Sequence, residues 1–359
     1  SSSMGTKLSS YVKKYYPDSK SDLFAVFMEK CHQMTGENRF QAMITQHAWM
    51  FLSSYEKLRE KLLLVDTINM VHLGARAFEE IAGEVVQTTS FVMRNNRIVG
   101  YKGTFCRLIE PTSQQGKEDM FLAKKNRYYT DQSNFSKIPG SPVAYWLSNK
   151  VFELYADSQT MEECAHPKVG MQTSNNNKYL RLWFEINYNE FNGTSCEMKW
   201  IKYLKGGAYR KWYGNLEYLL FYNNDKNYIL QQKNARVLEL NFLQKKKCTW
   251  TDLTSGKNSF RLAPDDTFYD ISGHCFFPSE QDQLWLLAYA NSVIFSTLKS
   301  VFNSTFHCQV GDVAKIVVPI LDMDQREKIS VLSRENVVAS KEDWDSYETS
   351  WDFKRHPMV

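Results

Sequence analysis

The chain has 359 residues, of which 43% are hydrophobic and 14% aromatic, and this is enough to build two or three domains with buried cores. No apolar run approaches the ~20 residues that cross a bilayer, and the polar start SSSMGTKLSS lacks the apolar middle of a signal peptide. We therefore expect a soluble, cytoplasmic protein without a membrane partner. The net charge of +4 is small for this length and neither requires nor excludes an anionic partner.

The first hundred residues predict half of an α/β sheet. A helix is predicted over residues 23–34, where the apolar face consists of Leu23, Val26, Phe27, Cys31 and Met34. The strand-like run FQAMITQ follows, and a second helix is predicted from about Ser53. Two further β-rich runs, TINMVHLG and TTSFVMRN, complete the order helix, strand, helix, strand, strand. This order is typical of half of an α/β sheet.

The pattern changes after residue 100. The strand-like run YKGTFCRLIE is followed by polar and loop-rich sequence, so we place a domain boundary here. A helix is predicted over residues 142–156, with Pro142 near its first turn. Short β-like segments follow, together with one long helix at Glu280–Phe302, which indicates an α+β domain. The predicted organisation is a partial α/β domain at 1–100, a linker at 101–140, an α+β domain at 141–335 and a connector at 336–359.

Common catalytic motifs are missing from the sequence. The chain contains neither GxGxxG nor GxxxxGK[ST], the glycine-rich turns that bring backbone N–H groups close to a nucleotide, and it lacks the GxSxG elbow of serine hydrolases. The neighbouring carboxylates Asp265 and Asp266, and Glu162 and Glu163, lie in polar surroundings that favour solvated turns over an acid–base pair. We therefore predict no catalytic residue in this chain.

The cysteines do not indicate a metal site. Seven cysteines lie far apart without a CxxC pair, and their odd number favours reduced thiols over a disulfide framework. His274 and His307 each precede a cysteine, but such neighbours are more often packing residues than ligands. We predict no metal. The cysteines are Cys31, Cys106, Cys164, Cys196, Cys248, Cys275 and Cys308.

The stretch KGGAYRKWYGN, residues 205–215, contains the only Gly-Gly pair of the chain beside three rings and two further cations. Two interpretations are open. The stretch is either a hairpin turn with packed rings and solvated charges, or a contact with a phosphate-rich polymer such as nucleic acid. The residues that would make this contact are Lys205, Tyr209, Arg210, Lys211, Trp212 and Tyr213.

Several stretches resemble a known family. The late motifs, V to VIII, of adenine-specific DNA methyltransferases are similar to DLFAVFMEKC, FQAMITQHAWMFLSSYEKLREKLL, INMVHLGARAF and VVQTTSFVMRN. The PglX family of methyltransferases, which belong to the BREX phage-defence systems, resembles YPDSKSDLFAVF, WMFLSSYEKLR, HLGARAFEEIAGEVVQTTSFV, IPGSPVAYW, KGGAYRKWYGN and SKEDWDSYETSWDFKRHP. These stretches span almost the whole chain in order. The S-adenosylmethionine glycine motif and the catalytic Asn-Pro-Pro-Tyr of such enzymes are absent here.

The resemblance implies a fragment of a site-specific adenine N6 DNA methyltransferase. It implies the C-terminal half of a Rossmann-like methyltransferase sheet, followed by an α+β target recognition domain. The parent enzyme would use S-adenosylmethionine to methylate adenine in duplex DNA and mark host DNA, as in restriction-modification. Double-stranded DNA is the implied partner, with other BREX proteins as further candidates, and we expect no turnover from this chain alone.

The resemblance also implies roles for individual residues. Phe27 matches an aromatic that related methyltransferases place against the adenine of S-adenosylmethionine, although Phe27 also lies on the apolar face of its predicted helix. Asn95 takes the position at which some relatives place the ring that stacks on the flipped base. The base-stacking partner is therefore not identified by the sequence.

Residues 170–183, GMQTSNNNKYLRLW, resemble a sequence common in recognition domains of restriction-modification enzymes. Their amides can bind base edges, and their cations can reach guanine or phosphates. The predicted DNA-binding set there is Gln172, Thr173, Asn175, Asn176, Asn177, Lys178 and Arg181. The predicted DNA-binding set also includes Lys199, Lys202, Gln309 and the residues of 205–213 named above. Lys245, Lys246 and Lys247 form another cationic cluster, and Asn303, Thr305, Gln309 and Asp312 lie in a loop that either orients the domain or contacts bases.

A different class of function stays open. The recognition-like fold could be a non-catalytic protein-interaction module of a phage-defence complex, with Trp212, Tyr213 and Trp344 as exposed anchors. Salt-sensitive duplex binding would favour the DNA interpretation, and a salt-insensitive protein complex would favour this alternative.

Overall fold

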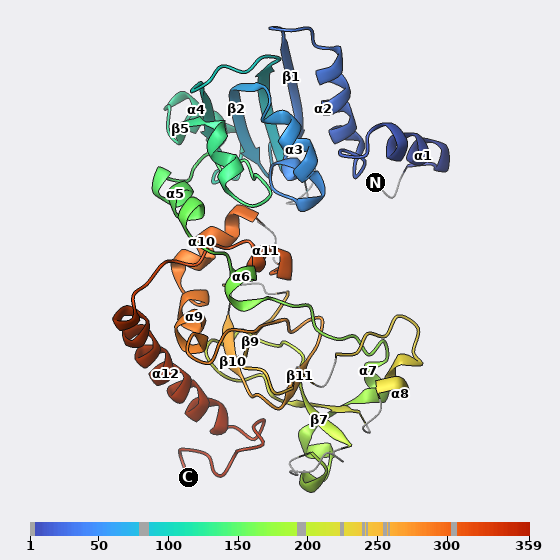
Figure 1. The fold of residues 1–359 in the computed structure, drawn as a ribbon, viewed down its shortest axis with the longest axis vertical. Helices are drawn as coiled ribbons and strands as arrows, with labels where there is room; N and C mark the ends of the chain where they lie inside the picture. The colour runs from blue at the N-terminus through green and yellow to red at the C-terminus, as the bar shows by residue number, and fades with distance from the viewer. Residues whose placement is uncertain are drawn as a thin grey trace. The chain divides into compact units, whose positions relative to one another are not determined.

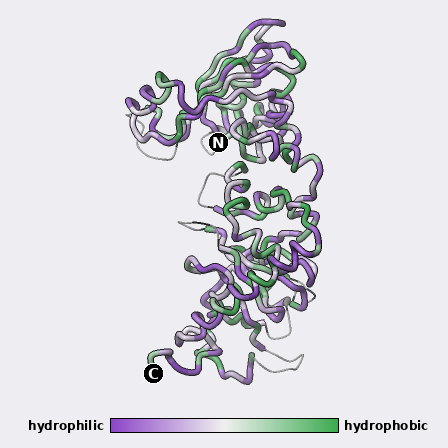
Figure 2. Tube along the Cα trace, turned by 90° about the vertical axis from the view of Figure 1, so that its left-hand side faces the viewer, coloured by the Kyte–Doolittle hydropathy of each residue, from purple (hydrophilic) through white to green (hydrophobic). Residues whose placement is uncertain are grey.

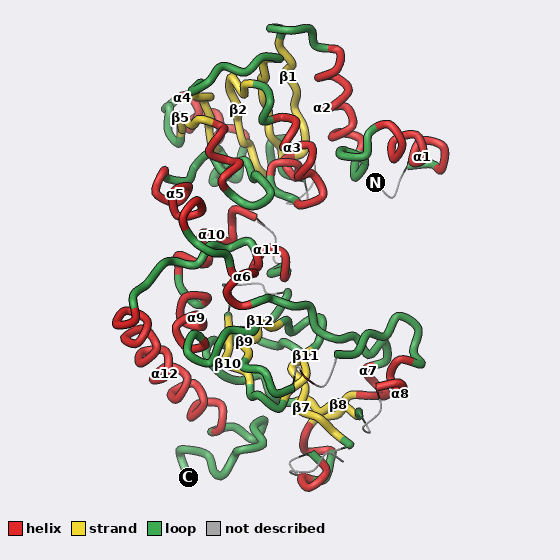
Figure 3. The backbone as a smooth tube through the Cα atoms, viewed as in Figure 1, coloured by secondary structure: helices red, strands yellow, loops and turns green. Residues whose placement is uncertain are grey.

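In the computed structural model, the chain divides into two units, Ser1–Asp157 and Ser158–Val359, which we name unit 1 and unit 2 (Figure 1). The structure describes residues 4–78, 86–191, 199–222, 226–238, 241, 243–253, 257, 259–302 and 307–359. Hydrophobic residues are spread along both units (Figure 2). Each unit has strands and helices of its own (Figure 3).

Unit 1 contains a five-stranded sheet in the order β1-β3-β2-β4-β5. Its strands are β1 (Phe40–Gln46), β2 (Asp66–Gly74), β3 (Thr88–Arg94), β4 (Lys102–Arg107) and β5 (Arg127–Asp131). β2 and β4 are parallel, and the other neighbouring pairs are antiparallel. β1, β2 and β4 therefore end at the same edge, which we call the carboxyl edge. The strands predicted at FQAMITQ, TINMVHLG and TTSFVMRN are confirmed.

Residues 101–140, which were expected to form a linker, carry two strands of this sheet. β4 pairs with β2 and β5 pairs with β4, and α4 (Gln114–Leu122) lies between the two strands in the chain. Phe105 of β4 is fully buried, and its ring stacks on that of Tyr145 with 4.9 Å between centroids. The sequence around α4 is polar, but pairing with a strand that is distant in sequence decides the structure of this region.

The remaining α-helices of unit 1 are α1 (Thr6–Tyr15), α2 (Leu23–Met34), α3 (Glu56–Leu62) and α5 (Asn149–Asp157). The helix predicted there is confirmed as α2, but its apolar face is only partly right, because Phe27 is 58% exposed. Val26 packs with Val12 and Tyr16 near α1. The Met28 carbonyl accepts a hydrogen bond from Gln41 of β1 at 3.0 Å. Because α2 has neighbours on two sides, its buried residues are Ala25, Val26, Met28 and Glu29.

The helix predicted over residues 142–156 begins only at Asn149. Before it, the backbone N–H of Val143 donates to the Met50 carbonyl at 2.9 Å. The Tyr145 ring is buried against Phe105. These long-range contacts hold the segment out of a helix, so the predicted start at Pro142 is wrong.

β1 stands at one end of the strand order. Gln41 and Thr45 are buried on one face of the strand, as expected for alternating side chains. On the other face, Phe40 and Ile44 are 62% and 61% exposed. The sheet is thus covered at β1 on one face only.

Unit 2 contains two sheets, in the orders β11-β7-β8-β6 and β10-β9-β12. The strands are β6 (Leu180–Leu182), β7 (Trp200–Leu204), β8 (Tyr218–Phe221), β9 (Lys247–Trp250), β10 (Phe260–Ala263), β11 (Thr267–Tyr269) and β12 (Cys275–Phe276). The helices are α6 (Met161–Ala165), α7 (Asn176–Tyr179), α8 (Lys226–Leu230), α9 (Gln283–Ala290), α10 (Val293–Phe302), α11 (Val310–Ala314) and α12 (Met323–Asp345). The chain as a whole is a mixed α/β protein with several sheets.

The single helix predicted at Glu280–Phe302 is two helices, α9 and α10, bent by 66°. Asn291 lies at the break, where its side chain accepts from the Phe260 N–H at 3.0 Å and donates to the Phe260 carbonyl at 2.9 Å. This pairing with β10 replaces continuation of the helix.

Among the described residues no single helix is long and apolar enough to cross a membrane, and α9 with α10 meets the length and composition test only as a bent pair.

α12 begins at a capping box. The Asp322 side chain accepts from the Gln325 N–H at 2.8 Å, and the Gln325 side chain accepts from the Asp322 N–H at 3.1 Å. The helix then continues across residue 336, where the connector was expected to begin. Its buried residues are Ser330, Ser333, Val337 and Trp344.

Candidate nucleic-acid interface

Residues 172–181, which we call the α7 turn, contain the short helix α7 and the first two residues of β6. The Asn175 side chain caps α7 by accepting from the Lys178 N–H at 3.2 Å. Thr173 is buried, and its hydroxyl donates to the Asn176 side chain at 2.6 Å. Thr173 therefore shapes the turn from inside. The exposed side chains of the turn are Ser174, Asn175, Asn176, Asn177 and Lys178.

Two cations of the α7 turn have no carboxylate partner within the described part of the chain. The Lys178 ammonium lies 5.1 Å from the Tyr179 ring centroid and 4.7 Å from that of Tyr228. Its interaction with Tyr179 raises the pKa of Lys178, which keeps the group charged. The Arg181 guanidinium donates to the carbonyls of Asn177 and Leu180, both at 2.7 Å. Ring faces and backbone carbonyls, rather than described carboxylates, are thus the contacts of these two charges.

Lys199 lies at the same end of the four-stranded sheet as the α7 turn. β6 and β7 both pair antiparallel with β8, so that Leu180 and Ile201 are both opposite Leu220. The chain runs into β6 from α7 and into β7 from Lys199, so the first residues of these two strands lie beside the end of β8 at Phe221. Lys199 is exposed.

Residues 205–215, which we call the glycine loop, follow β7 at the opposite end of the same sheet. Gly206 and Gly207 have φ of 85° and 138°, a region that glycine occupies readily. A Cβ on Gly206 would lie 2.7 Å from the Ser272 carbonyl oxygen, so the loop passes close to the chain before β12. The non-glycine residues Trp212 and Asn215 also have positive φ, at 72° and 59°. Backbone geometry, rather than ligand contact alone, accounts for the glycines.

The glycine loop is packed against α12 and the segment that follows it. The Arg210 guanidinium forms an ion pair with Asp343 and lies 5.0 Å from the Trp344 ring. Tyr213 is buried, burial raises its pKa, and the Lys341 ammonium lies 5.2 Å from its ring. Tyr213 and Trp344 were expected to be exposed anchors, and this expectation is wrong, since they are 9% and 6% exposed.

Lys211 and Trp212 are held by β10 and α9. The Lys211 ammonium donates to the Asn291 carbonyl at 2.9 Å, and burial lowers the pKa of Lys211. The backbone of Trp212 pairs with Phe260 and Leu262 at 2.9 and 2.7 Å. A pocket of about 350 Å³ remains between the loop and α12. Its lining is Arg210, Lys211, Trp212, Tyr213, Asn336, Ala339, Ser340 and Asp343.

The other predicted cations near this loop are also engaged. The Lys202 ammonium forms an ion pair with Asp266 at 2.8 Å and lies 5.1 Å from the Trp351 ring. Lys205 lies 5.1 Å from the Tyr218 ring. Tyr209 is exposed, at 52%. The glycine-loop end of the sheet therefore has its charges largely paired within the protein.

The cluster Lys245–Lys247 is not a cationic surface of three free charges. Lys246 forms an ion pair with Asp265 at 2.8 Å. Lys247 is buried, donates to three backbone carbonyls, and burial lowers its pKa to about 8. Gln309 is exposed just before α11. Asn303 and Thr305 lie outside the described residues.

In unit 1, the Asn95 side chain donates to the Thr35 carbonyl at 2.7 Å, and its N–H donates to the Arg39 carbonyl. These bonds join the end of β3 to the chain between α2 and β1, at the edge opposite the carboxyl edge. Ligands of open α/β sheets bind at the carboxyl ends of the strands. Asn95 therefore has a structural role.

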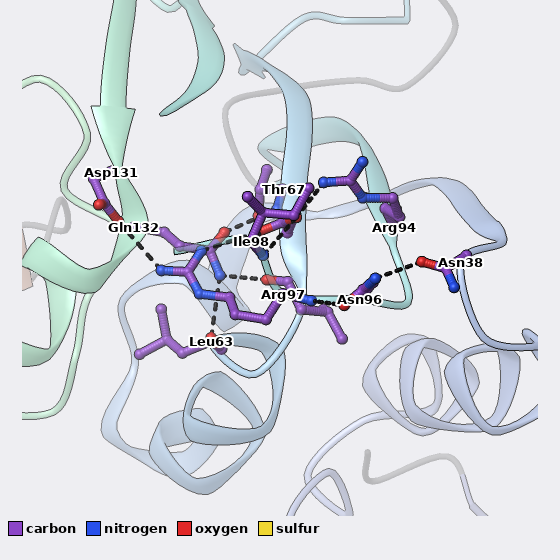
Figure 4. Close-up of polar contacts among 11 residues, drawn as sticks. Asn38, Leu63, Thr67, Arg94, Asn96, Arg97, Ile98, Asp131 and Gln132 are labelled. Carbon is purple, nitrogen blue, oxygen red and sulfur yellow. Dashed lines mark hydrogen bonds and ion pairs between the residues drawn. The ribbon is translucent and has the colours of Figure 1, made fainter. Parts of the chain in front are cut away.

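Arg94, the neighbour of Asn95 in the chain, belongs to a partly buried ion network (Figure 4). Asp66 is fully buried and pairs with Arg94 and, at 3.1 Å, with Arg97. Arg97 also contacts Asp131 at 3.2 Å. The Gln132 side chain accepts from the Thr67 N–H at 2.8 Å. The network ties β2, β3 and β5 together, which a structural role explains.

Sequence reasoning missed a buried histidine pair. His47 Nδ1 lies 2.8 Å from His72 Nε2, and His72 Nδ1 lies 3.2 Å from the Tyr145 hydroxyl. His47 comes directly after β1 and His72 lies near the end of β2, so the pair is at the carboxyl edge. No sequence spacing signals the pair, because pairing of both strands with β3 brings the rings together.

Among the described residues no group of three or more His, Cys, Asp or Glu could hold a metal ion.

Comparisons with known proteins point to one group. Residues 1–78 match the family model of the Eco57I restriction-modification methylase. The chain is 39% identical over 380 aligned positions to the adenine-specific methyltransferase PglX of Lacticaseibacillus casei (strain Zhang), covering 100% of this chain and 31% of that protein. It is 36% identical over 362 positions to the adenine-specific methyltransferase BrxX of Escherichia coli O9:H4 (strain HS), covering 99% of this chain and 29% of that protein.

The chain thus spans about a third of the length of the curated relatives that it matches. Its fold is similar to that of the type IIL restriction-modification enzyme MmeI, whose structure was solved in complex with DNA. The TM-score is 0.59 at 9% identity, covering 99% of this chain and 50% of that chain. At this identity the likeness concerns the fold alone.

Proposed function

This chain is related along its whole length to one segment of the adenine-specific methyltransferases PglX and BrxX, and from that premise we propose that it is the DNA-recognition segment of a site-specific adenine N6 methyltransferase of BREX phage defence. Unit 1 is then the C-terminal half of a Rossmann-like methyltransferase sheet, and unit 2 is the target recognition domain. Duplex DNA is the proposed partner of unit 2.

One observation carries the DNA assignment. Within the described part of the chain, the α7 turn and Lys199 present amides, together with cations that have no carboxylate partner, at one end of a sheet. Amides can bind base edges in the major groove, and cations can bind phosphates. The charges of Lys202 within β7 and of Arg210 in the glycine loop are already paired with Asp266 and Asp343. We therefore assign the principal DNA contact to the α7 turn and Lys199.

S-adenosylmethionine would supply the methyl group in the parent enzyme. The exposed ring of Phe27 offers one face against which its adenine could pack. The sequence lacks the glycine-rich turn that would approach the rest of the molecule closely. The residues present therefore do not make a complete cofactor site, and we assign no catalytic step to this chain. No methyl transfer is expected from the chain alone.

The proposal is tested by duplex binding at several salt concentrations. Phosphate contacts are independent of sequence, so a fluorescent duplex of mixed sequence is a sufficient probe, and each contact contributes about −0.9 to the slope of log affinity against log salt. We predict that Lys178→Ala with Lys199→Ala makes the slope less steep by about 2. The measurement is fluorescence anisotropy on the full chain.

The matched control is Lys7→Ala with Lys13→Ala, which removes the same charge from exposed positions of α1. The control is expected to keep the slope. A flat salt response of the unmodified chain, or an equal effect of the control pair, would contradict the assignment.

The second candidate function is a protein-interaction module. The pocket between the glycine loop and α12 would be its docking site, and Trp212 is the one proposed anchor of the three that is not buried. Burial of Tyr213 and Trp344 removes the other two, which favours the DNA assignment. A partner complex that is insensitive to salt and is lost in Trp212→Ala would favour this candidate.

A further inference from the structure

A second polar segment lies beside the α7 turn, at the same end of the sheet (Figure 3). We call residues 226–238, which begin with α8, the α8 segment. The Tyr179 hydroxyl donates to the Tyr228 carbonyl at 3.0 Å, and the two rings are 5.7 Å apart. Gln172 and Arg236 exchange two backbone hydrogen bonds, both of 2.8 Å. The two segments are thus joined at both ends.

The α8 segment is anchored by an apolar residue and directs polar groups outward. Ile229 is fully buried. The Gln232 N–H donates to the Ile229 carbonyl at 3.0 Å, and the Ala235 N–H to the Gln232 carbonyl at 3.1 Å, so the chain folds into consecutive turns. Asn234 has a φ of 66° within these turns. The exposed polar side chains are Gln231, Lys233, Asn234 and Arg236.

The charge of the two segments has one sign. Neither residues 170–184 nor residues 226–238 contain an Asp or a Glu. Within the described part of the chain, Lys233 and Arg236 form no ion pair with a carboxylate, and the Arg236 guanidinium donates only to the Val169 carbonyl, at 3.1 Å. This contrasts with Lys202, which is neutralised by Asp266. Over these two described stretches the side chains are cationic and rich in amides, and in the sequence Asp225 and Glu239 flank residues 226–238.

From this geometry we propose that the α8 segment is a second DNA-contact segment, continuous with the α7 turn. Lys233 and Arg236 bind phosphates, and the amides of Gln231 and Asn234 reach base edges, for which amide side chains offer both a donor and an acceptor. The inference rests on the proposed function and extends it to residues that sequence reasoning did not single out. The sequence signal was a run of amides and cations between Asp225 and Glu239.

The test is the pair Lys233→Ala with Arg236→Ala, measured by anisotropy with the same mixed-sequence duplex across a salt series. Losing two phosphate contacts is expected to make the slope of log affinity against log salt less steep by about 2. The exchange Lys233→Arg with Arg236→Lys keeps both charges and is expected to keep the slope. The control pair Lys7→Ala with Lys13→Ala is expected to change nothing.

Arg236 also bonds the Val169 carbonyl, so thermal unfolding followed by circular dichroism accompanies each variant. If the pair fails to fold, Lys233→Glu alone leaves Arg236 in place and is expected to reduce the slope by at least about 1. An unchanged slope in a folded variant overturns the inference.

The outcomes also separate the inference from the proposed function. If Lys178→Ala with Lys199→Ala weakens the salt dependence but the variants in the α8 segment do not, the DNA assignment stands and the inference falls. If the unmodified chain shows no salt-dependent duplex binding, both fall.

Discussion

At the scale of single residues, the neutral pair His47 and His72 depends on burial. Burial lowers the pKa of His47 to about 4. Burial, with smaller contributions from His47, Arg107 and Lys117, lowers the pKa of His72 to about 3. Two imidazoles hydrogen-bonded to each other require one unprotonated nitrogen between them, so the arrangement is intact only while at least one ring is neutral.

The pair predicts a loss of stability in mild acid. Both rings would take up protons near pH 6.5 in the unfolded chain, but only near pH 4 and 3 in the folded chain. The unfolded state therefore binds more protons in this window, and stability that is fully present above pH 6.5 falls as the pH drops toward 3. Each histidine contributes up to about 1.4 kcal/mol per pH unit. The measurement is the free energy of urea unfolding between about pH 7 and pH 4.

The matched variant is His47→Gln with His72→Gln, which removes both titrating rings and keeps side chains that can hydrogen-bond. This variant is expected to show a shallower dependence on pH than the unmodified chain. Equal slopes in the two proteins would show that other groups cause the acid sensitivity.

At the scale of elements, the glycine loop and α12 depend on close contact. Gly214 has a φ of 118°, and a Cβ there would lie 2.9 Å from Cε3 of Trp344 and 3.0 Å from the Arg210 side chain. Both the backbone conformation and the contact therefore require glycine at this position. The glycine loop, for which the sequence suggested a ligand contact, thus also packs against α12.

We predict that Gly214→Ala lowers the free energy of unfolding of unit 2 by about 2 to 3 kcal/mol, because it combines backbone strain with a clash against a buried ring. Gly311→Ala is the control, since a Cβ at Gly311 in α11 meets nothing within 4 Å and alanine favours a helix. Urea unfolding followed by circular dichroism compares the two. Equal stability of the two variants would contradict the packing argument.

The elements themselves show what local sequence decides. α2 and the first three strands were predicted correctly, because helical and alternating periodicity is strong there. The helices expected at 142–156 and 280–302 were wrong in extent. In both, hydrogen bonds to residues distant in the chain, Met50 and Phe260, override the local preference. Periodicity within a window carries no information about such partners.

At the scale of the whole unit 2, most of the predicted DNA-binding residues belong to two groups, the α7 turn with Lys199 at one end of the four-stranded sheet and the glycine loop at the other. Lys202 lies within β7, and Gln309 lies just before α11. The sequence shows which residues of unit 2 are cations and amides. It did not show which cations are paired, since Asp266 and Asp343 lie 64 and 133 residues from their partners. Sequence reasoning also did not select the α8 segment, because only the structure shows that this segment lies beside the α7 turn.

This division predicts that the two groups contribute unequally to duplex binding. Arg210→Ala with Lys211→Ala is expected to leave the salt slope unchanged and to alter affinity by less than about twofold, because Arg210 is ion-paired with Asp343 and the Lys211 ammonium is held by the Asn291 carbonyl. The same anisotropy series with Lys178→Ala and Lys199→Ala provides the comparison. If Arg210→Ala with Lys211→Ala changed the salt slope more than Lys178→Ala with Lys199→Ala, the DNA interface would have to be assigned to the glycine loop.

The position of β1 at the end of its sheet affects how the chain behaves in solution. A terminal strand offers backbone donors and acceptors to any extended peptide that approaches it. Exposed apolar side chains such as those of Phe40 and Ile44 favour this pairing, because they can be buried by it. We expect concentrated samples of the chain to self-associate through this strand, and a protein segment paired along β1 would prevent this.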